Sequence, residues 1–176
     1  MIEKYLQPHS NEKIEKYNRE EGLIKQTLGD FSINIEHIGS TSIPGLSAKP
    51  IIDMMVLTES IEDIKKVVEP LEKIGYSYKP EMSSGERIFL RKGEPVQYHL
   101  SISESKYPYW NRQILFRDYL RRHKESREEY QKIKEDSIKN LSENELKDIS
   151  KSEDYNSQKG PFIQKILQLA QEELGN

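Results

Sequence analysis

The sequence has no cysteine, no long apolar run and no excess of basic residues. Without cysteine, disulfides and thiolate metal sites are excluded. No apolar stretch approaches the roughly 20 residues of a membrane-spanning helix, and residues 1–10 lack the apolar core of a secretory signal. The net charge of -3 argues against a dedicated nucleic-acid binder, which is usually basic. These absences predict a cytoplasmic enzyme or binding protein with no membrane partner.

The chain has 176 residues, enough for one domain with a sizeable core. Alternating or continuous apolar residues predict strands at 32–37, 50–57, 76–78, 87–91 and 96–103. Helical periodicity is expected over 10–28, 60–74, most of the chain after 109, and a short segment at 142–149. Ile33 and Ile35 are expected to share a strand face, and Asp63 to complete a capping box. The pattern predicts one α+β domain, with a mixed sheet and flanking helices in 1–105 and a helical region in 106–176.

A loop of small residues separates the first two predicted strands. Gly39 can adopt a positive φ or let a ligand approach the backbone, and Ser40, Thr41 and Ser42 supply hydroxyls. Lys49 ends the loop, where its ammonium could meet a phosphate. The alternative is an ordinary strand connection with a solvated lysine. The P-loop pattern is absent, because Gly45 and Lys49 are separated by three residues.

Asp53 is the one acid in the apolar strand that follows this loop. A carboxylate among Ile, Met and Val side chains is costly to bury without a partner. If its strand face carries a site, Asp53 is a metal ligand or a general base. Otherwise it is paired with a nearby arginine or lysine.

His99 lies on the polar face of the strand at 96–103, together with Gln97, Ser101 and Ser103. It could bind a metal, act as an acid or base, or bond a phosphate, although a single histidine in a strand is more often a plain polar residue. On the preceding strand, Arg87 and Arg91 share a face with Phe89. Each arginine could bind an anion or be solvated.

The helical region carries many charges. Arg117, Arg121 and Arg122 fall close together on one predicted helix, and charges alternate along much of 117–139. We interpret this pattern as a solvated helix face with glutamate partners. It leaves open a structural or interaction protein that works through this charged region.

Several separate motifs resemble one known family. They are HIGSTSIPGLSAKPIIDMMV, the YHL strand, W-x5-FRDYLR, EEY-x2-IK, and Y-x3-K-x2-FI-x2-IL-x2-A. In order and spacing, from Ile14 to Ala170, they resemble the GrpB family. The resemblance implies a nucleotidyltransferase-like fold of the polymerase-beta superfamily. In that superfamily a Gly-Ser loop precedes a strand with two acids one residue apart, and a third acid comes from a later strand.

The resemblance implies Mg²⁺ chemistry, because two carboxylates at i and i+2 of a strand share a face and can hold the same metal ions. This chain departs from the pattern. Ile51 and Met55 stand two residues either side of Asp53, and neither offers the oxygen that Mg²⁺ prefers. The later strand reads His99-Leu100-Ser101, where many GrpB-like sequences read His-Leu-His.

Two hypotheses follow from the resemblance. In the first, the protein is an enzyme of nucleotidyltransferase type. In this hypothesis the phosphates of the nucleotide substrate are held by Gly39, Ser40, Thr41, Lys49 and Arg87. In this hypothesis Asp53 and His99 are the catalytic pair and hold Mg²⁺ or move a proton. In the second, the protein binds a nucleotide or phosphorylated small molecule without consuming it.

Overall fold

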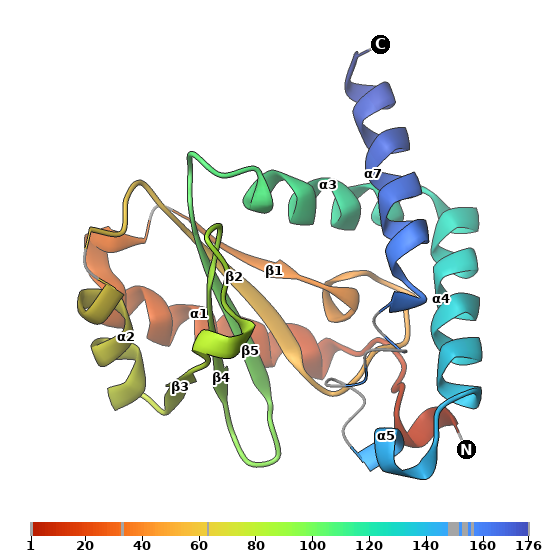
Figure 1. The fold of residues 1–176 in the computed structure, drawn as a ribbon, viewed down its shortest axis with the longest axis horizontal. Coiled ribbons are helices and arrows are strands. Elements are labelled where there is room, and N and C mark those ends of the chain that lie inside the picture. The colour runs from red at the N-terminus through yellow and green to blue at the C-terminus, as the bar shows by residue number, and fades with distance from the viewer. Residues whose placement is uncertain are drawn as a thin grey trace.

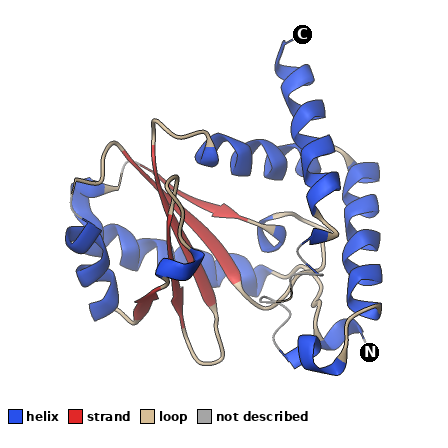
Figure 2. Cartoon of the chain, viewed as in Figure 1, coloured by secondary structure: helices blue, strands red, loops and turns tan. Residues whose placement is uncertain are grey.

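The computed structural model describes residues 2–32, 34–62, 64–147, 152, 155 and 157–175. Figure 1 follows the chain from its N-terminal helix through a sheet to the C-terminal helices, and Figure 2 separates strands from helices. Ile33, Asp63 and Ile149, which the sequence placed on a strand face, in a helix cap and at a helix end, lie outside the described residues.

The strands are β1 (Asn34–Ile38), β2 (Ile52–Thr58), β3 (Tyr76–Tyr78), β4 (Ile88–Lys92) and β5 (Tyr98–Glu104). They form one sheet in the order β1-β2-β5-β4-β3. The pair β2 and β5 is parallel, and the other neighbours are antiparallel. The helices are α1 (Asn11–Leu28), α2 (Ile64–Lys73), α3 (Tyr109–Arg122), α4 (Lys124–Lys139), α5 (Glu143–Lys147) and α7 (Gly160–Gly175). The predicted mixed α+β fold is confirmed.

One face of the sheet is apolar. Side chains of alternate strand residues, among them Met54, Leu90 and Leu100, pack in one cluster with residues of α1 and α2. A second apolar cluster joins α3, α4 and α7 to the loop after β1 through Ile43 and Leu46. None of the helices in the described ranges has the length and apolar character needed to cross a membrane.

The predicted start of the second helix is wrong. We expected Ser60 to begin it, but α2 begins at Ile64. The backbone N–H of Ile61 instead donates to Glu104 Oε1 at the end of β5, at 2.6 Å. A local capping pattern cannot reveal this acceptor, because it lies 43 residues away in the sequence.

The interpretation of Arg117 as solvated is also wrong, whereas the side chain of Arg121 is 39% exposed. Arg117 is only 7% exposed and donates to Glu36 Oε2 at 2.6 Å and to the carbonyl of His37 at 3.0 Å. Arg121 donates through Nε and Nη2 to the carbonyl of Ser42. These arginines attach α3 to β1 and to the turn after it, whereas Arg122 is exposed beside Glu173.

We expect Arg117→Met to lower the free energy of unfolding by about 2 kcal/mol, because the substitution leaves a partly buried carboxylate and a carbonyl without their donor. Urea denaturation followed by circular dichroism measures the loss. Arg122→Met is the matched control, since its exposed ion pair contributes little, and it should stay close to wild type. Equal stabilities for the two variants would contradict the role assigned to Arg117.

Candidate functional site

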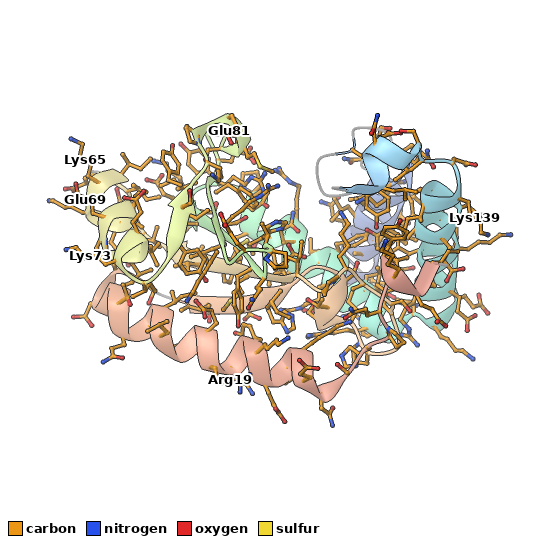
Figure 3. The ribbon with its side chains drawn as sticks, turned by 90° about the horizontal axis from the view of Figure 1, so that it is seen from below. Arg19, Lys65, Glu69, Lys73, Glu81 and Lys139 are labelled. Carbon is orange, nitrogen blue, oxygen red and sulfur yellow. The ribbon has the colours of Figure 1, made fainter. Side chains whose placement is uncertain are left out.

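A cleft of about 580 Å³ lies over the polar face of the sheet. Its walls come from the strands and the loop after β1 on one side, and from α3, α4 and the start of α7 on the other. In Figure 3, the part of the molecule that holds the strands, α1 and α2 forms one side, and the part that holds α4 and α7 forms the other. The volume falls within the range of small-molecule sites.

Asp53 and His99 are cross-strand neighbours at the base of this cleft. They face each other in the parallel register of β2 and β5. Asp53 Oδ1 and His99 Nδ1 are 3.0 Å apart, and His99 Nε2 is buried without a hydrogen-bond partner among the described residues. The structure thus brings together the two residues that the sequence singled out, as an acid paired with an imidazole.

Gly39 allows Asp53 to lie where it does. It adopts φ +66°, and a Cβ at this position would meet Asp53 Oδ2 at 2.5 Å. Any larger residue would therefore combine a strained backbone with a collision against the carboxylate. The loop can lie this close to Asp53 because residue 39 is a glycine.

The hydroxyls of the Gly-Ser loop contact protein groups. Ser40 is hydrogen-bonded to Tyr130 of α4. Thr41 Oγ1 lies 2.8 Å from His37 Nε2, and Ser42 donates to the carbonyl of Gly39 at 2.7 Å. Burial lowers the pKa of His37 to about 4, so this imidazole is neutral at pH 7. A phosphate at Thr41 would therefore compete with its existing hydrogen bond to His37.

The two candidate arginines differ in what their guanidinium groups contact. Arg87 donates to Tyr109 Oη at 2.9 Å and to the carbonyl of Met82 at 3.0 Å. Arg91 lies opposite His99 in the register of β4 and β5 and is 8% exposed. Its Nε and Nη2 have no hydrogen-bond partner among the described residues. Of the two arginines, Arg91 has more unsatisfied hydrogen-bond donors among the described residues.

Residues that sequence reasoning missed line the helical side. They are Lys134 of α4, Lys159 before α7, and the aromatic residues Tyr130 and Tyr155. Burial is the main cause that lowers the pKa of each lysine to about 7. The available signal was the family resemblance, since these four residues stand in the EEY-x2-IK and Y-x3-K motifs. Periodicity alone did not distinguish them from solvated residues.

The donor set does not fit Mg²⁺. Asp53 supplies the one carboxylate among the described residues of the cleft lining, and its nearest polar partner is a ring nitrogen. Mg²⁺ requires oxygen ligands in octahedral geometry. No group of three His, Cys, Asp or Glu residues in the described part of the chain could hold a metal ion. The prediction that Asp53 and His99 bind a metal gains no support from this geometry.

Comparison with solved structures shows the type of fold. The fold resembles that of Cid1 poly(U) polymerase, in a structure described with Mg and 3'-dATP bound. The TM-score is 0.52 at 15% identity, over 75% of this chain and 44% of that one, so the likeness concerns the fold alone. The mixed α+β fold is therefore nucleotidyltransferase-like.

The family model described as GrpB protein matches residues 5–169, and the chain belongs to the GrpB family. The crystal structure of conserved protein GrpB from Enterococcus faecalis has a TM-score of 0.82 and 32% identity, covering 97% of this chain and 99% of that one. Glutamate-rich protein GrpB of Alkalihalophilus pseudofirmus is 31% identical over 92% of each chain. UPF0157 protein YqkA of Bacillus subtilis is 40% identical over 126 residues. The match covers 70% of this chain but only 37% of that relative's length.

We expect Gly39→Ala to lower the free energy of unfolding by more than about 1 kcal/mol, because of the positive φ and the contact with Asp53. Gly22→Ala is the control. Gly22 lies in α1 with nothing within 4 Å of an added Cβ, and alanine there should raise stability by roughly 0.5–1 kcal/mol. Denaturant titrations compare the two, and an unchanged Gly39→Ala variant would contradict the tight approach.

Lys134 should make stability depend on pH. Its pKa falls from 10.5 to about 7 on folding, so between these pH values the unfolded state binds a proton that the folded state lacks. The free energy of unfolding therefore rises with pH in this window, by up to about 1.4 kcal/mol per unit from this group.

Lys134→Met removes this contribution, so its stability relative to wild type should fall as pH rises from 7 toward 10.5. Urea titrations at several pH values in phosphate-free buffer measure the slope. Lys139→Met changes an exposed lysine of the same helix and should keep the wild-type slope. A Lys134→Met slope equal to wild type would show that the buried ammonium titrates normally.

Proposed function

We propose that the cleft binds a phosphorylated small molecule, such as a nucleotide, directly through cationic side chains. The observation that carries this proposal is the charge of the lining. Among its described residues are six lysine and arginine side chains, Lys49, Arg87, Arg91, Arg112, Lys134 and Lys159, and one carboxylate, Asp53. A concave surface of one sign attracts ligands of the other sign.

Arg91 is the central ligand in this proposal. A guanidinium offers five donors in a planar fork that matches phosphate oxygens. Burying such a group without partners is costly, and an anion in the cleft would supply them. The Nε and Nη2 groups of Arg91, which have no hydrogen-bond partner in the described part of the chain, are therefore the local feature that most favours an anionic ligand.

Aromatic side chains suit the organic part of such a ligand. Phe89, Tyr109, Phe116, Tyr130 and Tyr155 line the same cleft as the cationic residues. Aromatic rings give planar, apolar contact area on which a heterocyclic base can stack. This combination favours a nucleotide over a phosphorylated compound without a ring.

Transfer of a nucleotidyl group with Mg²⁺ is the second candidate, and the fold favours it. The residues at the base of the cleft do not favour it, because Asp53 has no second carboxylate on its strand and its Oδ1 lies against His99. Binding through side-chain cations needs no metal. The two functions therefore differ in their dependence on Mg²⁺ and in whether the ligand is consumed.

Thermal shifts with ATP, UTP, GTP and CTP, in EDTA and in Mg²⁺, test the proposal. We expect at least one nucleotide to raise the melting temperature in EDTA, without pyrophosphate release. Arg91→Met should weaken its binding by about tenfold or more, since a charge-assisted hydrogen bond contributes about 1.5–3 kcal/mol. Arg122→Met, on the exposed part of α3, should bind as wild type. Shifts that require Mg²⁺ and accompany pyrophosphate release would favour the transferase instead.

A further inference from the structure

The two ring nitrogens of His99 differ in what they contact. Nδ1 lies 3.0 Å from Asp53 Oδ1, whereas Nε2 is buried and has no hydrogen-bond partner among the residues that the structure describes. An ionised carboxylate can only accept, so Nδ1 carries the hydrogen of this bond. In the neutral ring Nε2 is then an acceptor with a free lone pair. Asp53 therefore sets His99 as a hydrogen-bond acceptor in the cleft.

The unsatisfied groups of His99 and Arg91 lie close together. These residues are opposite one another in the register of β5 and β4, so their side chains leave the same face of the sheet side by side. The ring of Phe89 lies beside both, with its centroid 5.1 Å from that of His99 and 5.8 Å from Cζ of Arg91. All three residues line the cleft. A ligand that contacts one of the two polar groups is therefore within reach of the other.

The two polar groups require opposite partners. Nε and Nη2 of Arg91 are donors, and phosphate oxygens can accept from them. Nε2 of the neutral His99 ring needs a donor, which a fully ionised phosphate lacks. In a nucleotide, the hydroxyls at C2' and C3' of the ribose can donate. Because an unsatisfied buried polar group costs free energy, the site favours a ligand that carries both an oxyanion and a hydroxyl.

We propose that His99, oriented by Asp53, binds a ribose hydroxyl of the nucleotide whose phosphate is bound by Arg91. This inference rests on the proposed function and narrows its ligand to a ribonucleotide with a free hydroxyl at C2' or C3'. His99 contacts the ligand, and Asp53 acts through it as a positioning residue. The protein therefore distinguishes ribonucleotides from dideoxynucleotides by one acceptor at the base of the cleft.

The affinities for ATP, UTP, GTP and CTP, each compared with its 2',3'-dideoxy analogue, test this inference. Calorimetric titrations in EDTA give the ratio of the two dissociation constants. We expect wild type to bind at least one ribonucleotide about fivefold or more tightly than its dideoxy analogue, since the analogue cannot donate to the buried acceptor. The 2'-deoxy and 3'-deoxy forms then show which hydroxyl is bound.

Variants of His99 assign the preference to its ring. His99→Phe keeps a ring of similar shape without nitrogens, so the ratio should fall to about one. His99→Gln keeps an oxygen that can accept and should retain part of the preference. His123→Phe is the matched control and should keep the wild-type ratio. His123 follows α3, is not among the described residues that line the cleft, and pairs with Glu173.

Nitrogen NMR of the histidine rings gives a readout that a merely structural role would not change. The His99 signals are those that disappear in His99→Phe. We expect the hydrogen of the neutral ring on Nδ1, and a change in the Nε2 shift when the ribonucleotide is added but not when its dideoxy analogue is added. A neutral ring with its hydrogen on Nε2 would overturn the acceptor role.

The outcomes separate this inference from the proposed function. If Arg91→Met weakens binding but wild type binds ribonucleotides and dideoxy analogues equally, the role of His99 is overturned and the anion site at Arg91 stands. A preference that persists in His99→Phe also overturns it. If none of the triphosphates binds to wild type, the inference is overturned together with the binding of a nucleotide. A preference lost in His99→Phe and kept in His123→Phe supports it. The wild-type comparison and the NMR of His99→Gln test the inference even if His99→Phe is poorly folded.

Discussion

The parallel pairing of β2 with β5 decides where Asp53 and His99 lie in the cleft. Because side chains alternate across a strand, the register that sets Asp53 beside His99 also turns Met54 and Leu100 to the apolar face. A slip of one residue would bury the acid against α1 and α2 and expose the core. The hydrophobic contacts of one face thus fix the polar site on the other, and β4 then adds Arg91 opposite His99.

Much of the fold could be predicted from the sequence because its signals are local. Alternation in 96–103 predicted the polar face that carries His99, and the apolar run around Asp53 predicted a central strand. The pairing of these strands depends on tertiary topology, which neither segment contains by itself. Asp53 and His99 could each be singled out by residue type, and only the sheet shows that they are hydrogen-bonded.

The charged helices show where local reasoning fails. Alternating charge predicts a solvated helix, but Arg117, Arg121 and Lys134 donate to carbonyls or a carboxylate of the β1–β2 region, and Arg117 and Lys134 are buried. Their acceptors are 79 to 87 residues away in the sequence, so the helix pattern cannot reveal them. Long basic side chains can bury their stems along apolar surface and still satisfy their heads, which composition alone does not indicate.

The electrostatic balance of the cleft follows from the same arrangement. In the superfamily that the fold resembles, clustered carboxylates need metal ions before they can approach a phosphate. Here one carboxylate lies beside an imidazole and against Gly39, while lysines and arginines supply the positive charge from the other walls. A phosphate placed directly over Asp53 would meet like charge, so a bound anion is stabilised best when its charged groups lie toward Arg91 and the lysines. In the proposed function, side chains of the helical region would therefore contribute the positive charge that a metal-dependent site obtains from its metal ions.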